Sequence, residues 1–230
     1  REVRPTFLTA VPRIFEKIHA KILDSVASMT GVKRKLADWS IAVGLQTVPY
    51  RQKSQDLPFM LGLKYKIADK LVLNKFRAAL GGKVRACSSG GSALSKEVGS
   101  FFCGIGITII EGYGLTETSP VMTVGHSDFF KFGTVGKAIP GVEVKIQPDG
   151  EIVCRGHNVM MGYYKNEEAT NEAIIDGWFH SGDIGEFDED GLLRITDRKK
   201  SLIVTSGGKN VAPQPMEVSL TSNKYIEQCN

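Results

Sequence analysis

The stretch Glu111-Gly112-Tyr113-Gly114-Leu115-Thr116-Glu117-Thr118 follows an apolar, β-branched run, Ile105–Ile110. Such a run predicts a buried strand that ends at about residue 110. Two glycines around a tyrosine let the backbone approach a flat ligand on which the ring can stack. A hydroxyl and a carboxylate follow at once, and they suit a phosphate oxygen and a hard cation such as Mg²⁺. The octapeptide alone is equally consistent with a glycine-rich turn around a hydrogen-bonded threonine.

A second small-residue stretch, Ser88-Ser89-Gly90-Gly91-Ser92-Ala93, lies upstream. It separates a strand candidate at 83–87 from a helix that presents Leu94, Val98, Phe101 and Phe102 on one face. Strand, turn, helix and strand form the βαβ pattern of a parallel sheet, whose ligands bind beyond the carboxyl ends of the strands. Both stretches are therefore expected at one rim. The segment has neither the Walker lysine nor the GxGxxG spacing, so a plain strand-to-helix turn is the alternative.

The N-terminal part is expected to be helical scaffold. Pro12 predicts a helix start and Gly31 a stop, and a second helix is expected over 35–47. The polar stretch 49–58 is predicted to be a loop, because its two prolines argue against a continuous helix. A third helix is expected to carry Ile67 to Phe76 and to end at Gly81-Gly82.

From residue 133 onward the pattern is β-rich. Val142–Ile146 and Glu151–Cys154 predict a hairpin around Pro148-Asp149-Gly150, and a short helix is expected over 166–174. Further strands are expected at 178–186 and 192–196. Charge rises after Asp197, and Gly207-Gly208 follows. We therefore predict an α/β fold with domain limits at 1–196, including a β-rich subdomain at 133–196, and at 197–230.

Two further groups of residues suggest binding chemistry. Asp183 lies between glycines after an aromatic run, where its carboxylate could accept two ribose hydroxyls or form an Asx-turn. His180 has no nucleophile beside it, so we expect a packing or hydrogen-bonding role. Arg198 could hold a phosphate or ribose edge, and the alternative is a solvated basic loop.

Composition limits the classes of function. The net charge of +4 is scattered over 230 residues, which predicts no nucleic-acid partner. No apolar run reaches the roughly 18 residues that span a bilayer. The four cysteines are far apart, as expected for reduced thiols in a cytoplasmic compartment. Arg13, Lys17 and Lys21 lie on the expected polar side of the first helix, so peripheral contact with a membrane surface is a further interpretation. The start at Arg1 suggests an internal fragment.

Taken together, the motifs resemble the adenylate-forming superfamily, specifically long-chain acyl-CoA synthetases. The resemblance covers nearly the whole chain, and seven motifs occur in the family's order. They are Thr9–Arg13, Ser89–Leu94, Tyr113–Glu117, Gly150–Gly156, Met161–Tyr164, Gly177–Gly185 and Asp197–Pro213. The long-chain assignment depends on the first and the last of these motifs. The chain would then hold the later part of the large domain and the start of the small one.

The resemblance implies ATP, AMP, Mg²⁺ and coenzyme A as ligands and a fatty acid as substrate. Tyr113 would stack on adenine, Thr116 would bind phosphate and Glu117 would hold the Mg²⁺, while Asp183 would take the ribose hydroxyls and Arg198 the ribose–phosphate edge. Asp197 would be the hinge of the small domain. The remaining nucleotide and pantetheine contacts would come from Ser89, Gly90, Gly91, Ser92, Ala93, Glu111, Gly112, Gly114, Leu115, Gly207 and Gly208.

Two departures from the family pattern matter. The Ser/Thr/Gly-rich phosphate loop with its lysine and the lysine of the C-terminal domain do not occur in this sequence. We therefore expect the 230-residue chain alone to have little or no ligase activity. The alternatives are a fatty acyl-AMP ligase, an aryl-CoA ligase, or a non-catalytic AMP-binding module that regulates a partner.

Overall fold

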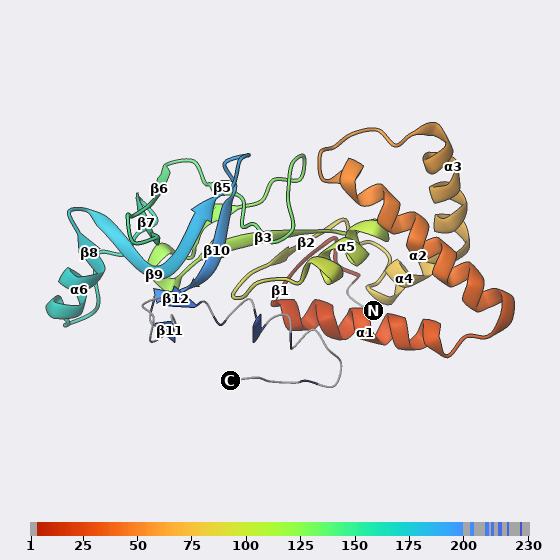
Figure 1. Ribbon diagram of the computed structural model, residues 1–230, viewed down its shortest axis with the longest axis horizontal. Helices are drawn as coiled ribbons and strands as arrows, with labels where there is room; N and C mark the ends of the chain where they lie inside the picture. The colour runs from red at the N-terminus through yellow and green to blue at the C-terminus, as the bar shows by residue number, and fades with distance from the viewer. Residues whose placement is uncertain are drawn as a thin grey trace. The chain divides into compact units, whose positions relative to one another are not determined.

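The computed structural model describes residues 4–199, 203–204, 210–211, 213, 216–217, 220 and 226 (Figure 1). The chain forms two compact units. The first comprises Arg1–Glu111 and Gly125–Gly133, and the second comprises Gly112–Val124 and Thr134–Asn230. The predicted α/β class is confirmed, because the first unit contains parallel strands with helices and the second is built largely from antiparallel strands.

The sheet of the first unit is parallel. Strand β1 (Phe7–Ala10) pairs with β2 (Ala86–Ser89), which pairs with the first half of β3 (Thr108–Gly114) in a register that sets Ser89 opposite Glu111. Helix α5 (Lys96–Gly104) connects β2 to β3, and the Ser95 side chain caps it by accepting the Val98 N–H. The predicted βαβ unit is confirmed, while β1 was not predicted.

Among the other helices, the predicted start at Pro12 and the predicted end before Gly81-Gly82 are confirmed, and the remaining boundaries differ. These helices are α1 (Pro12–Ala27), α2 (Gly31–Arg51), α3 (Phe59–Ala68), a π-helical turn at Asp69–Leu73 and α4 (Asn74–Ala79). The predicted loop start at Pro49 was wrong. Pro49 lies in the last turn of α2, where proline removes a single helical hydrogen bond near an end that already has free carbonyls. Gly31 begins α2 instead of ending α1.

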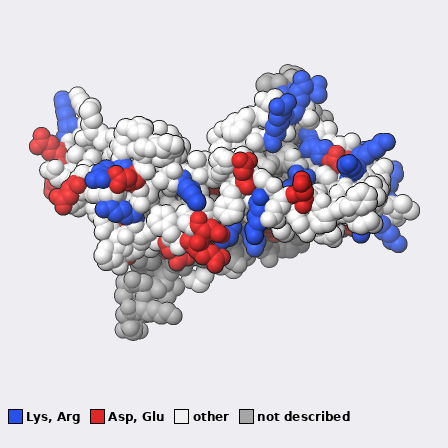
Figure 2. Space-filling model, turned by 90° about the horizontal axis from the view of Figure 1, so that it is seen from above, with Lys and Arg blue, Asp and Glu red and all other residues white. Residues whose placement is uncertain are grey.

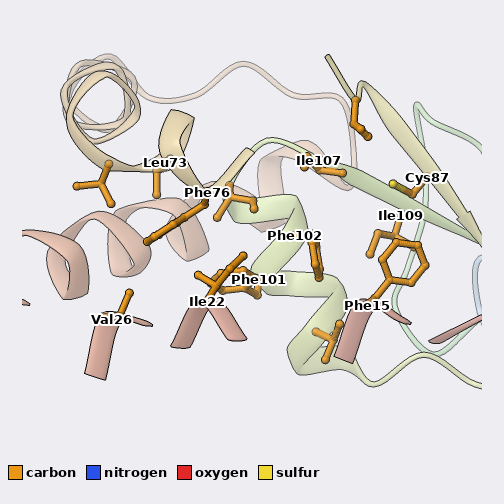
Figure 3. Packing of buried hydrophobic residues seen from close by; sticks show 14 of the residues in the cluster. Phe15, Ile22, Val26, Leu73, Phe76, Cys87, Phe101, Phe102, Ile107 and Ile109 are labelled. Atoms are coloured by element: carbon orange, nitrogen blue, oxygen red, sulfur yellow. The ribbon is translucent and has the colours of Figure 1, made fainter. Parts of the chain in front are cut away.

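The core of the first unit joins these helices to the sheet. Phe15 and Ile22 from α1 lie beside Phe102 and Phe101 from α5, and Val26 of α1 belongs to the same cluster (Figure 3). The same cluster includes Leu73, Phe76, Cys87, Ile107 and Ile109. Burial of each large apolar side chain contributes about 1.5–3 kcal/mol, so this cluster holds β2 and the first half of β3 in place.

Helices α2 and α5 approach backbone to backbone. A Cβ added at Gly44 would lie 2.7 Å from the Gly104 carbonyl oxygen, and one added at Gly104 would lie 2.9 Å from the Gly44 carbonyl carbon. Glycine at both positions therefore permits this contact.

The second unit contains antiparallel strands. The end of β3 pairs with β4 (Val121–Val124), which pairs with β5 (Lys137–Ala138). A second sheet has the order β10 (Leu193–Arg198), β9 (Trp178–Phe187), β7 (Glu151–Gly156) and β6 (Val142–Ile146), and β8 (Ile174–Ile175) pairs with β9. The elements that complete this unit are the 3₁₀ turn η2 (Thr116–Thr118), α6 (Glu167–Ala173), β11 (Ile203–Val204) and β12 (Asn210–Val211). The predicted hairpin and the β-rich character of this part of the chain are confirmed. The predicted domain limits, 1–196 with a subdomain at 133–196 and then 197–230, stay a prediction.

Two strands run further than predicted. Strand β3 continues to Gly114, so Tyr113 lies within a strand and not in a turn after it. Strand β10 continues to Arg198, so Asp197 is a strand residue paired with Ile184. In both cases a neighbouring strand extends the hydrogen-bond ladder beyond the apolar run. The predicted hinge role of Asp197 stays a prediction.

The described cysteines are buried, and most of the described charged side chains lie on the surface. Cys87, Cys103 and Cys154 are buried free thiols, and burial raises the pKa of each to about 11; Cys229 lies outside the described residues. Acidic and basic side chains are interspersed on the face shown in Figure 2. Among the described helices, none combines the length and the hydrophobicity that a membrane crossing requires.

Candidate functional site

The carboxylate of Asp183 contacts two other predicted site residues, Tyr113 and Arg198. Its Oδ2 accepts a hydrogen bond from the Tyr113 hydroxyl at 2.7 Å, and its Oδ1 lies 3.2 Å from Arg198 Nε. The Asp183 side chain is 7% exposed, whereas that of Arg198 is 71% exposed. Since β9 and β10 pair with Asp183 opposite Arg198, the ladder itself brings the acid and the base together.

The backbone around Asp183 is held by residues that the sequence analysis did not select. The Ser181 hydroxyl donates to the Ile152 carbonyl at 2.6 Å and accepts the Asp183 N–H at 3.1 Å. Gly182 has a φ of +71°, and its N–H donates to Glu151 Oε1 at 2.9 Å. The pairing of β7 with β9 shifts register at this point, as at a β-bulge. Asp183 therefore lies next to a β-bulge whose backbone is held by the side chains of Ser181 and Glu151.

Glu151 is the centre of that support. Its side chain is 6% exposed, and Oε2 lies 3.0 Å from both His180 Nδ1 and Lys199 Nζ. Burial alone would raise the pKa of Glu151, but the His180, Lys199 and Gly182 contacts outweigh it and the pKa lies below its usual value. His180 thus has the hydrogen-bonding role that was expected. The sequence placed Glu151 at the start of a predicted strand and within the motif Gly150–Gly156, but it gave no sign of the burial of this side chain.

Tyr113 lies in β3 and is 8% exposed. Burial, followed by the charge of Asp183, raises the pKa of its hydroxyl, which therefore stays protonated as a donor. The predicted stacking of adenine on this ring stays a prediction, and the structure adds the link between the hydroxyl and Asp183.

Thr116 and Glu117 belong to η2, just after β3. Thr118 shapes this turn, because its hydroxyl accepts the Leu115 N–H at 2.9 Å. The amide group of Asn158 donates to the carbonyl oxygens of Thr118 and Val121, at 3.0 and 2.8 Å. Thr116 is left exposed and Glu117 half-buried. Hydrogen bonds made by Thr118 and Asn158 thus fix the turn, while the Thr116 hydroxyl and the Glu117 carboxylate lie at positions that solvent can reach.

The Tyr163 hydroxyl donates to Glu117 Oε1 at 3.0 Å. Tyr163 belongs to one of the family motifs but was not selected as a site residue. Within the described part of the chain, no group of three or more acidic, histidine or cysteine side chains could hold a metal ion. One carboxylate still suits Mg²⁺, which usually binds one or two protein carboxylates together with substrate phosphates and water.

The remaining predicted residues are distributed as follows. Ser89 ends β2 with a buried hydroxyl that has no partner among the described residues, and Gly91, Ser92 and Ala93 form an exposed loop. Glu111 lies in the same unit as this loop, and Gly112 to Glu117 belong to the other. Asp197 is 1% exposed and accepts the Arg198 N–H at 2.6 Å. Gly207 and Gly208 lie outside the described residues.

Comparison with known proteins identifies the class. The family model described as AMP-binding enzyme matches residues 1–164. Long-chain-fatty-acid–CoA ligase FadD15 of Mycobacterium tuberculosis is 44% identical over 98% of this chain and 37% of its own length. Long-chain-fatty-acid–CoA ligase ACSBG2 of Xenopus laevis is 42% identical over 94% of this chain and 30% of its own length. The chain thus spans about a third of the length of the curated relatives that it matches.

Solved structures agree in fold. O-succinylbenzoate coenzyme A synthetase from Bacillus subtilis, in complex with ATP and magnesium ion, matches 67% of this chain and 36% of its own with a TM-score of 0.60 and 29% identity. An anthranilate CoA ligase in complex with anthranoyl-AMP covers 99% of this chain and 36% of its own, with a TM-score of 0.64 and 19% identity. The fold and these matches together define an α/β protein of the adenylate-forming kind. The chain belongs to the AMP-binding enzyme family.

Proposed function

We propose that this chain is part of an ATP-dependent long-chain fatty acid–CoA ligase. In the first half-reaction the fatty acid carboxylate attacks the α-phosphate of ATP, giving an acyl-adenylate and diphosphate. In the second the CoA thiol displaces AMP and forms the thioester. The observation that supports this most directly is the Asp183 carboxylate, which lies with the Tyr113 hydroxyl and the Arg198 guanidinium in one cluster.

The chemistry of this cluster suits a ribose and its phosphate. A carboxylate can accept hydrogen bonds from vicinal hydroxyls, and a mostly exposed guanidinium can pair with a phosphate oxygen. We assign the adenine to the Tyr113 ring, the ribose to Asp183, and the phosphate to Thr116 and Arg198. The loop Gly90–Ala93 and Glu111 to Leu115 would complete the nucleotide walls, and Gly207-Gly208 would border CoA.

Glu117 is the residue that would hold Mg²⁺ together with the phosphates of ATP. When bound, the ion offsets the negative charge that develops as the adenylate forms. Within this chain, Tyr163 orients the carboxylate and Thr116 lies next to it, accessible to a phosphate oxygen.

Replacing Tyr163 with phenylalanine is expected to weaken Mg²⁺-dependent binding of ATP about threefold to tenfold, because Glu117 loses the hydroxyl that orients it. Stability is expected to change by less than about 1 kcal/mol, since this hydrogen bond is exposed. Titration calorimetry with ATP, with and without Mg²⁺, measures the effect. An equal loss of affinity in the absence of Mg²⁺ would contradict the assignment, and Tyr164→Phe is the control because Tyr164 is 88% exposed.

Diphosphate–ATP exchange tests the proposed reaction. It is measured on the longer ligase polypeptide that contains this sequence, with acids of graded chain length. Long-chain acids are expected to give the fastest exchange, and Thr116→Ala is expected to slow it about tenfold or more, the effect of losing a hydrogen bond of roughly 1.4 kcal/mol to a charged group. Preference for acetate, an aryl acid or an amino acid would end the long-chain proposal. AMP binding without exchange would instead support the non-catalytic module.

We further propose a cytoplasmic protein that associates peripherally with membranes. The three buried free thiols support a reducing compartment, and Lys17 and Lys21 on exposed positions of α1 support contact with anionic lipid. Sedimentation with anionic liposomes, for the unchanged chain and for a variant with Arg13, Lys17 and Lys21 reversed in charge, tests the association. Equal sedimentation of both would exclude it.

A further inference from the structure

The carboxylate of Glu111 holds two separate segments of the first unit. Its Oε1 accepts the Leu94 N–H at 3.2 Å, and its Oε2 accepts the Gly133 N–H at 3.4 Å. Leu94 is the residue that follows the loop Gly90–Ala93, and Gly133 ends the segment that starts at Gly125. Glu111 itself is 8% exposed. A buried acid is thus satisfied by two backbone donors far from it in sequence.

Both ends of the loop Gly90–Ala93 are fixed at Glu111. Ser89, which precedes the loop, is the strand partner of Glu111 in the β2–β3 ladder. Leu94, which follows the loop, is bound by the Glu111 side chain and is 3% exposed. Between these ends Gly91 has a φ of +85°, and Gly91, Ser92 and Ala93 are exposed. The shape of the loop therefore depends on a single residue of the neighbouring strand.

We infer that Glu111 is a positioning residue, whose ionised carboxylate holds the loop Gly90–Ala93 in the conformation that binds the nucleotide. The nucleotide part of this inference rests on the proposed function, and the anchoring part does not. Only an ionised carboxylate offers a strong acceptor to each N–H, because the hydroxyl oxygen of a protonated carboxyl accepts more weakly and an amide nitrogen does not accept at all. A protonated carboxyl or a glutamine amide places a hydrogen-bearing group opposite one of the two donors.

The anchor is expected to titrate near neutral pH. Burial raises the pKa of Glu111 to about 7, and the Leu94 and Gly133 N–H groups oppose that rise. The other charged or titratable groups on the contacting segments are Cys87 on β2, Lys96, Glu97 and Cys103 on α5, and His126, Asp128 and Lys131 between Gly125 and Gly133. Above pH 7 both hydrogen bonds form. Below it the carboxyl binds a proton and one of them is lost.

The experiment follows backbone amide resonances of the 230-residue chain by NMR from pH 5.5 to 8.5. The Leu94, Gly133 and Gly90–Ala93 amides are expected to shift together with one midpoint near 7. Glu111→Gln is expected to abolish this transition, whereas Glu16→Gln, at an exposed position of α1, keeps it. His126→Gln must keep it as well, because histidines in general titrate in this range.

Absence of a shift at Leu94 and Gly133, or an unchanged shift in Glu111→Gln, overturns the anchor. A shift at those two amides without one at Gly90–Ala93 overturns the positioning of the loop. If Glu111→Gln fails to fold, the titration of the unchanged chain still decides, and Glu111→Asp is the second variant. Its shorter side chain is expected to lose at least one of the two shifts.

The affinity of the same chain for AMP, measured against pH, separates the positioning role of Glu111 from the proposed ligase function. If only the ionised form binds, affinity is expected to be about tenfold weaker at pH 6 than at pH 8, because about a tenth of the molecules are then competent. Since a phosphate monoester also titrates near 6, Glu111→Gln supplies the reference profile. If AMP affinity depends on pH in the same way for the unchanged chain and for Glu111→Gln, the positioning role is overturned. No AMP binding at either pH, with the amide titration intact, counts against the proposed function and leaves the anchor standing.

Discussion

Gly114→Ala is expected to destabilise the second unit by at least about 3 kcal/mol, more than any other single methyl group added to the candidate site. A Cβ at this position would lie 1.6 Å from the Pro120 carbonyl oxygen and 2.9 Å from the Val121 Cα. These are backbone atoms of the adjoining segment, so no side-chain rotation relieves the clash. Strands β3 and β4 would have to separate at the point where the ladder shifts register.

Gly112→Ala is the matched control, two residues earlier in the same strand. Its Cβ would meet the Thr123 carbonyl oxygen at 3.6 Å and Val124 Cγ2 at 3.8 Å, both ordinary contacts. The free energy of unfolding of this variant is expected to stay within about 1 kcal/mol of that of the unchanged chain. The added methyl group meets only ordinary contacts, and alanine leaves the unfolded chain less conformational entropy than glycine does. Denaturant unfolding followed by circular dichroism measures both. Equal midpoints for the two variants would contradict the close approach at Gly114.

Asp183→Ala is expected to have the second largest effect, on stability and on nucleotide binding together. The Tyr113 hydroxyl would be left buried without its acceptor, at a cost of about 1–3 kcal/mol. The ion pair with Arg198 is expected to add little, since that side chain is 71% exposed and screened by solvent. Asp183→Asn keeps an acceptor for the tyrosine and is expected to be less destabilising than alanine.

A double-mutant cycle isolates the hydrogen bond. In a Tyr113→Phe background no donor remains, so Asp183→Ala is expected to cost about 1–2 kcal/mol less than in the unchanged chain. AMP affinity is a separate measurement, and both Asp183 variants are expected to weaken it at least about tenfold in either background. Additive stabilities would refute the Tyr113–Asp183 bond. Unchanged AMP affinity would refute the ribose assignment and leave the bond intact.

Local patterns of the sequence were sufficient to predict the order of most helices and strands. The apolar run before Glu111, the small residues at 88–93 and the alternation in 142–154 predict the βαβ unit and the hairpin, because side-chain period and turn chemistry are properties of neighbouring residues. The boundaries failed where a partner strand decides them. Tyr113, Asp197 and Arg198 lie in strands because β4 and β9 offer hydrogen bonds beyond the apolar stretch.

The sequence by itself also determined which residue types are available, including an aspartate between glycines, a tyrosine between glycines and an arginine after a strand. Only the tertiary structure decided that Asp183 meets Tyr113, 70 positions away. It also decided that the Glu151 carboxylate binds both the Gly182 N–H and the Lys199 ammonium group. The same holds for Glu111 and its two backbone donors. Such contacts depend on strand register, because a shift of one residue turns every side chain to the opposite face of the sheet. In a hairpin such as β6–β7 a local turn fixes the register. Between strands that are far apart in the sequence, the packing of whole elements against one another sets it.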